Sequence, residues 1–253
     1  MLPLLRLFAR LPLSLAHALG ALLGLLSLLR LRLRQDIAEG LRQAGLDAPG
    51  RVRRAAMELG KGITELPAIW LRPLDEMAGW MREVRGWEHV EAALAKGKGL
   101  IVMGPHLGSL ELAGIYLGTR LPLTALYTRP RQEWFHQMMR EGRERCGGHT
   151  VEPNLAGVRA LLTALKRNEA VWVLPDQRAT KGEGIWAPFF GRWAYLPTLF
   201  YRLRAKSGAA AVLFCCERLP RGRGYRLTIE PMPELPADTD AAVRVVNGAL
   251  EDM

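Results

Sequence analysis

A histidine and a glutamate lie five positions apart where an apolar segment is interrupted. His106 follows the apolar run Leu100–Met103 and the break Gly104-Pro105, and Glu111 is the second residue of an apolar segment that begins at Leu110. The apolar run predicts a short buried strand, and the Gly-Pro pair ends it. Two residues five apart in one helix would lie about 140° from each other. The side chains of His106 and Glu111 can therefore meet only if His106 is still in the loop and Glu111 is already helical.

This pair of residue types is able to move a proton. A carboxylate bonded to one ring nitrogen of a histidine fixes the tautomer and makes the other nitrogen more basic. That nitrogen can then remove the proton of a hydroxyl as a general base. The plain alternative is a loop histidine without a role and a glutamate that favours the dipole at the start of a helix. Because the pair follows a predicted strand and is flanked by glycines, we predict that His106 and Glu111 form a catalytic dyad.

Polar residues also follow two further predicted strands. Arg129 comes just after the strand predicted over residues 121–127, and Asp176 just after the one over residues 169–175. Helices predicted over residues 132–145 and 155–167 alternate with these strands, which indicates an α/β fold with a mostly parallel sheet. In such a sheet the carboxyl ends of the strands share one edge, so His106, Arg129 and Asp176 are expected to converge. Taken singly, Arg129 also fits a solvated loop charge, and Asp176 a turn residue or helix cap.

The C-terminal third adds two candidate substrate-binding residues. A glycine-rich loop leads into the aromatic segment from Gly184 to Gly191, which is typical either of an apolar channel or of core. A further helix is predicted over residues 197–205, with Thr198 near its start. Strands over residues 209–217 and 225–231 and a last helix from residue 238 complete the pattern. We expect Gly184 and Thr198 to contribute to substrate binding.

The first 34 residues predict a membrane anchor. Residues 11–29 contain no Asp, Glu, Lys or Arg, and 19 helical residues span about 28 Å, close to the thickness of the hydrocarbon core of a bilayer. Arginines flank this run, and the denser cluster after it indicates a cytoplasmic main body. A helix lying in the membrane interface and a cleavable signal peptide are the alternatives. Residues 35–95 predict amphipathic helices that pack on the core, and residues 96–253 predict the α/β core itself.

Charge and cysteine content restrict the partners. The net charge of +10 favours acidic partners such as anionic lipid, an acidic protein, phosphate groups or nucleic acid. The arginines are scattered and no recognition motif is present, which argues against nucleic acid. The three cysteines have no paired spacing, which fits a reducing compartment and predicts no metal site.

Together these motifs resemble the lipid A biosynthesis acyltransferases, the lauroyl and myristoyl transferases of Gram-negative inner membranes. The pattern of a histidine followed five positions later by an acidic residue is also shared with the wider glycerolipid acyltransferases. The resemblance covers most of the chain and rests on an ordered set of segments: the N-terminal apolar helix, Gly104 to Glu111, Tyr127 with Arg129-Pro130, Leu174 to Gln177, and Gly184 to Gly191.

Three departures from the family pattern stand out. Pro105 precedes the histidine where the family usually has Asn, and Asp176-Gln177-Arg178 replaces an Asp-Gln-Asp that is often found there. The family also normally continues to a Pro-x-Gln-Tyr-x-Trp segment, which this sequence does not reach. We therefore expect either a divergent or a truncated member.

The resemblance implies a reaction. His106, oriented by Glu111, would deprotonate an acceptor hydroxyl that attacks an acyl thioester, and backbone amides or Arg129 would stabilise the oxyanion. Asp176 would position the acceptor or a basic partner, and neither a metal nor a cofactor is needed. The implied donor is acyl carrier protein or acyl-CoA, and the implied acceptor is a phosphorylated glucosamine disaccharide lipid at the inner membrane. Other glycolipid, aminolipid or lysophospholipid acceptors, and an inactive membrane-anchored homologue, remain alternatives.

Overall fold

The computed structural model describes residues 2–253, with side chains from residue 5 onward. The chain forms two compact units. The first contains the residues up to Arg82 together with 190–192 and 218–225, and the second contains 83–189, 193–217 and 226–253. The predicted boundaries after residues 34 and 95 stay predictions, because compactness alone does not define functional parts.

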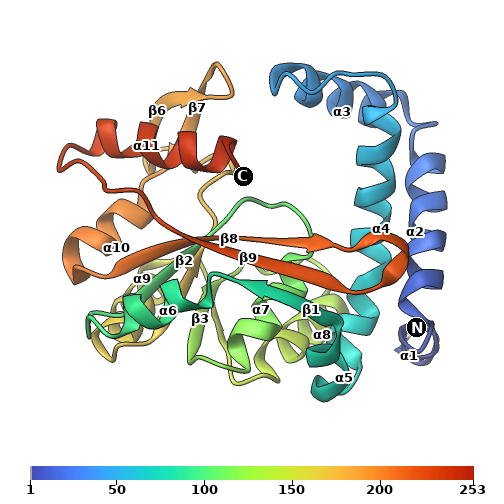
Figure 1. Cartoon of the computed structure of the whole chain (residues 1–253), viewed down its shortest axis with the longest axis horizontal. Coiled ribbons are helices and arrows are strands. Elements are labelled where there is room, and N and C mark those ends of the chain that lie inside the picture. The colour runs from blue at the N-terminus through green and yellow to red at the C-terminus, as the bar shows by residue number, and fades with distance from the viewer. Residues whose placement is uncertain (1) are drawn as a thin grey trace. The chain divides into compact units, whose positions relative to one another are not determined.

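The first unit is helical. Its elements are α1 (Leu2–Ala9), α2 (Leu13–Ser27), α3 (Leu31–Gln43), α4 (Arg51–Leu71), α5 (Leu74–Trp80) and the short turn η1 (Pro220–Gly222). Helices α2 and α4 run side by side (Figure 1) and approach closely because small residues face each other. A Cβ on Gly24 would lie 1.9 Å from the carbonyl oxygen of Ala56, and one on Gly60 would lie 1.9 Å from that of Gly20. These glycines are required by the contact between the two helices.

The predicted anchor segment is a shorter helix than its apolar run suggested. Helix α2 has 15 residues, which corresponds to about 22 Å. In the part of the chain that the structure describes, no single helix has both the length and the apolar character of a membrane span. Helices α2 and α3 meet those criteria only as a pair, and the chain bends by 102° between them.

The second unit is built on a seven-stranded sheet with the strand order β1-β9-β8-β2-β5-β3-β4. Strands β8, β2, β5, β3 and β4 pair in parallel. Strands β8 and β9 are neighbours joined by six residues, too few for a parallel crossover, so the sheet is mixed. The strands are β1 (Met81–Arg85), β2 (Leu100–Met103), β3 (Leu123–Leu126), β4 (His149–Val151), β5 (Ala170–Val173), β8 (Ala210–Arg218) and β9 (Tyr225–Pro231). The predicted α/β class with a mostly parallel sheet is confirmed.

Helices cover the sheet and complete the core. They are α6 (Trp87–Leu94), α7 (Leu110–Gly118), α8 (Glu133–Glu144), α9 (Leu155–Lys166), α10 (Leu199–Ser207) and α11 (Thr239–Glu251). Side chains of α9, α10 and α11 pack with Ile101, Met103 and Val171 of the sheet in one buried cluster. A separate two-stranded ribbon, β6 (Gly184–Phe189) with β7 (Arg192–Pro197), contacts α11. The segment predicted as channel or core is therefore largely a ribbon.

The strand order positions the site. Strand β5 lies directly beside β2, although β3 comes between them in the sequence. Met103, the last residue of β2, is aligned with Val173, the last residue of β5. Residues that follow these two strands therefore leave the sheet next to each other.

Candidate active site

The loop after β2 is held against β8 by two glycines. A Cβ on Gly104 would lie 2.5 Å from the carbonyl oxygen of Phe214, and one on Gly108 would lie 2.0 Å from that of Cys216. Gly108 also has a φ of +68°, a conformation that glycine adopts without strain. Ser109 N–H donates to the Cys216 carbonyl at 2.8 Å. The loop that carries His106 is thus fixed on both sides of the histidine.

The carboxylate bound to His106 is that of Asp176. With its proton on Nδ1, the ring donates to Asp176 Oδ1 at 2.6 Å, and the backbone N–H of His106 donates to Oδ2 at 2.7 Å. The Asp176 side chain is 13% exposed and that of His106 is 37% exposed. Two hydrogen bonds from one residue orient the carboxylate, and the carboxylate in turn holds the ring. This is the orienting contact that was predicted for Glu111.

Glu111 instead binds an arginine. It is the second residue of α7, and Arg143 of α8 donates to its two oxygens at 3.0 Å from Nε and 2.5 Å from Nη2. Burial alone would lower the pKa of Arg143, but the hydrogen bond and charge of Glu111 outweigh it and the pKa is raised. The bidentate pair joins α7 to α8. The structure thus assigns Glu111 a partner other than the one predicted.

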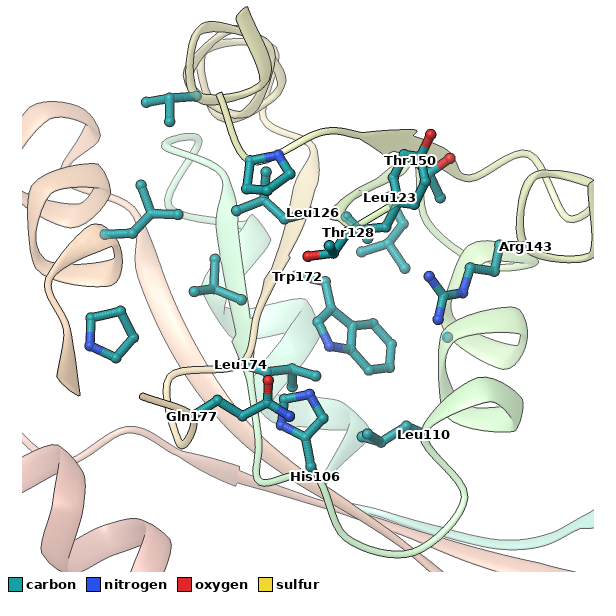
Figure 2. A pocket seen from close by; sticks show the side chains of 18 of the residues that line it. His106, Leu110, Leu123, Leu126, Thr128, Arg143, Thr150, Trp172, Leu174 and Gln177 are labelled. Atoms are coloured by element: carbon teal, nitrogen blue, oxygen red, sulfur yellow. The ribbon is translucent and has the colours of Figure 1, made fainter. Parts of the chain in front are cut away.

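His106, Glu111 and Arg143 line one cavity of about 910 Å³. Most of its wall is apolar, and it contains the indole of Trp172 from β5, which packs edge-to-face on Phe214 with ring centres 4.5 Å apart. Figure 2 shows this indole centrally among the labelled side chains, with His106 and Gln177 on one side. Many other apolar lining residues come from α7, α8, α9 and the ends of β3 and β5: Leu110, Gly114, Ile115, Leu123, Ala125, Leu126, Met139, Leu155, Val158, Val173 and Leu174. A volume of this size is at the upper end for ligand pockets.

The other predicted site residues are distributed unevenly. Thr198, at the start of α10, lines the cavity. Arg129 is not among its lining residues and donates to Glu133 at 2.7 Å on an exposed surface. Gly184 is also not a lining residue, although its neighbour Glu183 is. His106, Glu111 and Thr198 therefore line one cavity, and Asp176 is bonded to His106 without being a lining residue. Arg129 and Gly184 lie outside the cavity wall.

Several further lining residues were not predicted from the sequence, among them Arg143 and Trp172. Arg143 is one of many arginines on a polar helix, and Trp172 is one apolar residue of a buried strand. Tyr127, expected only as part of a family segment, donates or accepts a hydrogen bond of 2.9 Å with buried His136 while their rings stack. No local pattern distinguishes these residues, because their proximity depends on the order of the strands. Among the described residues no group of three or more His, Cys, Asp or Glu side chains is arranged to hold a metal ion.

Comparison of the sequence with known proteins identifies a family. The model of the bacterial lipid A biosynthesis acyltransferases matches residues 5–252. The chain belongs to this family. The resemblance predicted from the motifs is therefore confirmed.

Individual relatives of this chain differ in their named substrates. The chain is 31% identical to the lipid A biosynthesis palmitoleoyltransferase of Escherichia coli (strain K12) over 195 residues. These residues are 76% of this chain and 63% of that protein. It is 28% identical over 246 residues to the lauroyltransferase of the same organism, covering 93% of this chain and 78% of that one. It is also 29% identical over 195 residues to the phosphatidylinositol mannoside acyltransferase of Mycobacterium tuberculosis (strain ATCC 25618 / H37Rv), covering 76% and 58%. The chain thus spans under two thirds of the length of some relatives.

Proposed function

We propose that this chain transfers a fatty acyl group from an acyl thioester to a hydroxyl of a lipid A precursor, with His106 as the general base. The observation that carries the proposal is the 2.6 Å hydrogen bond to Asp176 from Nδ1 of His106, which lines a large, mainly apolar cavity. Family membership supports the reaction class. A histidine oriented by a carboxylate beside a cavity for a long chain is the arrangement that such a transfer needs.

The proton moves through one ring nitrogen. Because Nδ1 is engaged by Asp176, Nε2 accepts the proton of the acceptor hydroxyl. The oxygen forms a bond to the thioester carbonyl carbon, which becomes a tetrahedral oxyanion. The carbon–sulfur bond then breaks and the proton on Nε2 passes to the departing sulfur, which yields an ester and a free thiol. The side-chain amide of Gln177, the lining residue next to Asp176, is a suitable N–H donor for the oxyanion.

Glu111 has a positioning role in this proposal. Its carboxylate receives both hydrogen bonds of the Arg143 guanidinium, which fixes α8 against α7 at the cavity wall. Arg129 lies on an exposed surface with Glu133, so the oxyanion donor proposed here is a lining residue instead. The apolar lining supplied by α7, β3 and β5 would hold the acyl chain.

The donor and the membrane are part of the same proposal. A net charge of +10 supports an acidic donor such as acyl carrier protein, or acyl-CoA with its phosphates. The face of α2 away from α4 exposes leucines, including Leu22, Leu23 and Leu26 at 52–54% exposure, and arginines lie near both ends of the helix. This pattern supports association of the first unit with an anionic membrane surface, the inner membrane in this proposal. The predicted spanning anchor becomes an interfacial helix here because α2 is short and one face is packed on α4.

The test is acyl transfer itself. The purified protein in detergent is incubated with acyl carrier protein charged with labelled C12 or C14 chains and a tetra-acylated lipid A precursor, and the product mass is measured. We expect a gain of one acyl chain, lost in His106→Ala and retained in His89→Ala, a control histidine on α6 outside the cavity. Undiminished transfer by His106→Ala would refute the proposed base.

A second acceptor class has support from one relative. The mycobacterial relative is named for acylation of a phosphatidylinositol mannoside, a glycolipid of another type. Transfer to such a glycolipid, an aminolipid or a lysophospholipid, with none to the lipid A precursor, would keep the mechanism and change the acceptor. No transfer to any lipid by folded protein would favour an inactive homologue.

A further inference from the structure

Two arginines of the cavity wall have no acidic partner among the residues that the structure describes. Arg178, two residues after Asp176, and Arg202, in the first turns of α10, both line the cavity and are exposed. Neither guanidinium makes an ion pair or hydrogen bond with residues that the structure describes, whereas the third arginine of the wall, Arg143, is bound by Glu111. The wall contains three arginines against two glutamates, Glu111 and Glu183. Positive charge is therefore in excess and concentrated on Arg178 and Arg202.

The backbone segments that carry these arginines are joined to each other. Ala179, the residue after Arg178, donates its N–H to the Tyr195 carbonyl of β7 at 2.9 Å. The loop continues to Glu183, whose carbonyl accepts both the N–H and the hydroxyl of Thr198 at 3.1 Å each. Thr198 in turn caps the helix that carries Arg202, since Arg202 N–H donates to the Thr198 carbonyl at 3.2 Å. The backbone segments that carry Arg178 and Arg202 thus form one hydrogen-bonded frame at the cavity wall.

This frame is close to the reacting histidine. Two trans peptide units separate Arg178 from Asp176, so their Cα atoms lie at most about 7 Å apart. Asp176 is bonded to His106. Arg178 therefore belongs to the same cavity wall as His106, and its backbone is close to the residue that binds His106.

We propose that Arg178 and Arg202 bind a phosphate group of a substrate during acyl transfer. The proposal rests on the acyltransferase function proposed above. The planar guanidinium donates paired hydrogen bonds to phosphate oxygens, and two such groups on one frame match a tetrahedral anion with several oxygens. The phosphate comes either from the headgroup of the acceptor or from the phosphopantetheine arm of the donor.

The test measures each substrate separately. The variants are Arg178→Gln, Arg202→Gln and the double variant, with Arg178→Lys as the conservative change. The matched control is Arg159→Gln, an exposed arginine of α9 that does not line the cavity. Each protein is assayed with phosphorylated and dephosphorylated acceptor, and with acyl-phosphopantetheine and acyl-pantetheine as donors. Melting temperatures verify that the variants fold.

We expect each Gln variant to raise the KM of the phosphate-bearing substrate roughly tenfold to a hundredfold, the effect of losing one hydrogen bond to a charged group. The kcat at saturation changes little, Lys restores part of the loss, and the control has none. The substrate whose KM rises only in its phosphorylated form identifies the source of the phosphate. Equal KM values in all variants, or a loss that persists without the phosphate, would overturn the proposal while leaving the acyltransferase function intact.

A binding measurement keeps the site testable if the enzyme transfers nothing. Quenching of tryptophan fluorescence, with Trp172 in the cavity wall, is followed during titration with dodecyl phosphate and with dodecanol. The wild-type protein and Arg159→Gln should bind the phosphate at least tenfold more tightly than the alcohol, and the double variant should not. The same preference in the double variant would refute the phosphate site independently of catalysis.

Discussion

Replacing Asp176 by Asn distinguishes the two candidate partners of His106. Asp176 presents two acceptor oxygens, one to the ring Nδ1–H at 2.6 Å and one to the backbone N–H at 2.7 Å. Asparagine has one acceptor oxygen and one NH₂ donor. If its oxygen faces the backbone N–H, its NH₂ faces Nδ1, and the ring must carry its proton on Nε2, the atom that should act as the base.

The size of the effect follows from what is lost. General base catalysis contributes about 10²- to 10⁴-fold, so removing it raises the barrier by about 3–5 kcal/mol. In the opposite orientation the asparagine oxygen accepts from Nδ1–H, so the ring keeps the tautomer that catalysis needs. The asparagine NH₂ then faces the backbone N–H of His106, and the hydrogen bonds to a charged carboxylate are lost, which costs about 1.5–3 kcal/mol. We therefore expect kcat of Asp176→Asn to fall by about 10- to 10⁴-fold, with the smaller loss in the second orientation. Because the substitution preserves shape, KM should change little.

Glu111→Gln is the matched comparison. It removes the charge that binds Arg143, and breaking a fully buried pair costs about 3–5 kcal/mol. The two side chains here are 18% and 30% exposed, so solvent reduces the cost to roughly 1–2 kcal/mol, or about 2–8 °C in melting temperature. We expect this variant to lose stability more than kcat. The assay is single-turnover acyl transfer at a temperature where both variants are folded, with thermal unfolding in parallel. A kcat for Asp176→Asn near that of wild type, together with a Glu111→Gln defect as large as that of His106→Ala, would refute the assignment of Asp176.

Three further predictions concern the cavity, its loop and a thiol. Gly114→Leu should reduce transfer of C14 chains more than of shorter chains, because even a Cβ at this position would lie 3.3 Å from the Trp172 indole. The masses of the products formed from mixed donors give the ratio of long to short chains transferred. Gly108→Ala should lower the unfolding free energy by at least about 1–2 kcal/mol, because φ is +68° and the Cβ would lie 2.0 Å from the carbonyl oxygen of Cys216; urea titration measures it. Burial and the charge of Glu217 raise the pKa of the Cys215 thiol. Glu217→Gln should therefore lower that pKa and speed the alkylation of Cys215 at pH 8, a rate that peptide mass spectrometry measures. An unchanged alkylation rate would contradict this.

Local patterns predicted most strands and helices of the second unit. The apolar run at Leu100–Met103 is β2 as predicted, and residues 225–231 are β9. Helices α8 and α9 lie within one residue of their predicted ends. These elements have strong signals in short stretches of sequence: a continuous apolar run between breakers, or a 3.6-residue period. The strand β1 was not predicted because its residues alternate only partly and it follows a helix directly.

Helix α2 shows that composition does not determine which surroundings an apolar helix packs against. An apolar run indicates that a segment prefers apolar surroundings, which can be either lipid or protein. In α2 the residues Gly20 and Gly24 face α4, while most of the leucines are exposed and Leu13 is buried, so one apolar run contributes to two different surfaces. The signal for the packed face is the spacing of the small residues, which have low hydropathy and are overlooked when the run is treated as a uniform span.

The partner of His106 depended on a feature that local sequence does not contain. From the chain alone, Glu111 is the nearest acidic residue, and the sequence distance to Asp176 is 70 residues. Three strands were correctly expected to end at one edge, but the edge alone does not state which two are adjacent. The order β2-β5-β3 makes Asp176 the neighbour of His106, whereas Glu111 binds Arg143 of α8. Strand order therefore decides which residues at strand ends contact each other. Two residues that follow adjacent strands are better candidates for a catalytic contact than two residues that are only close in sequence.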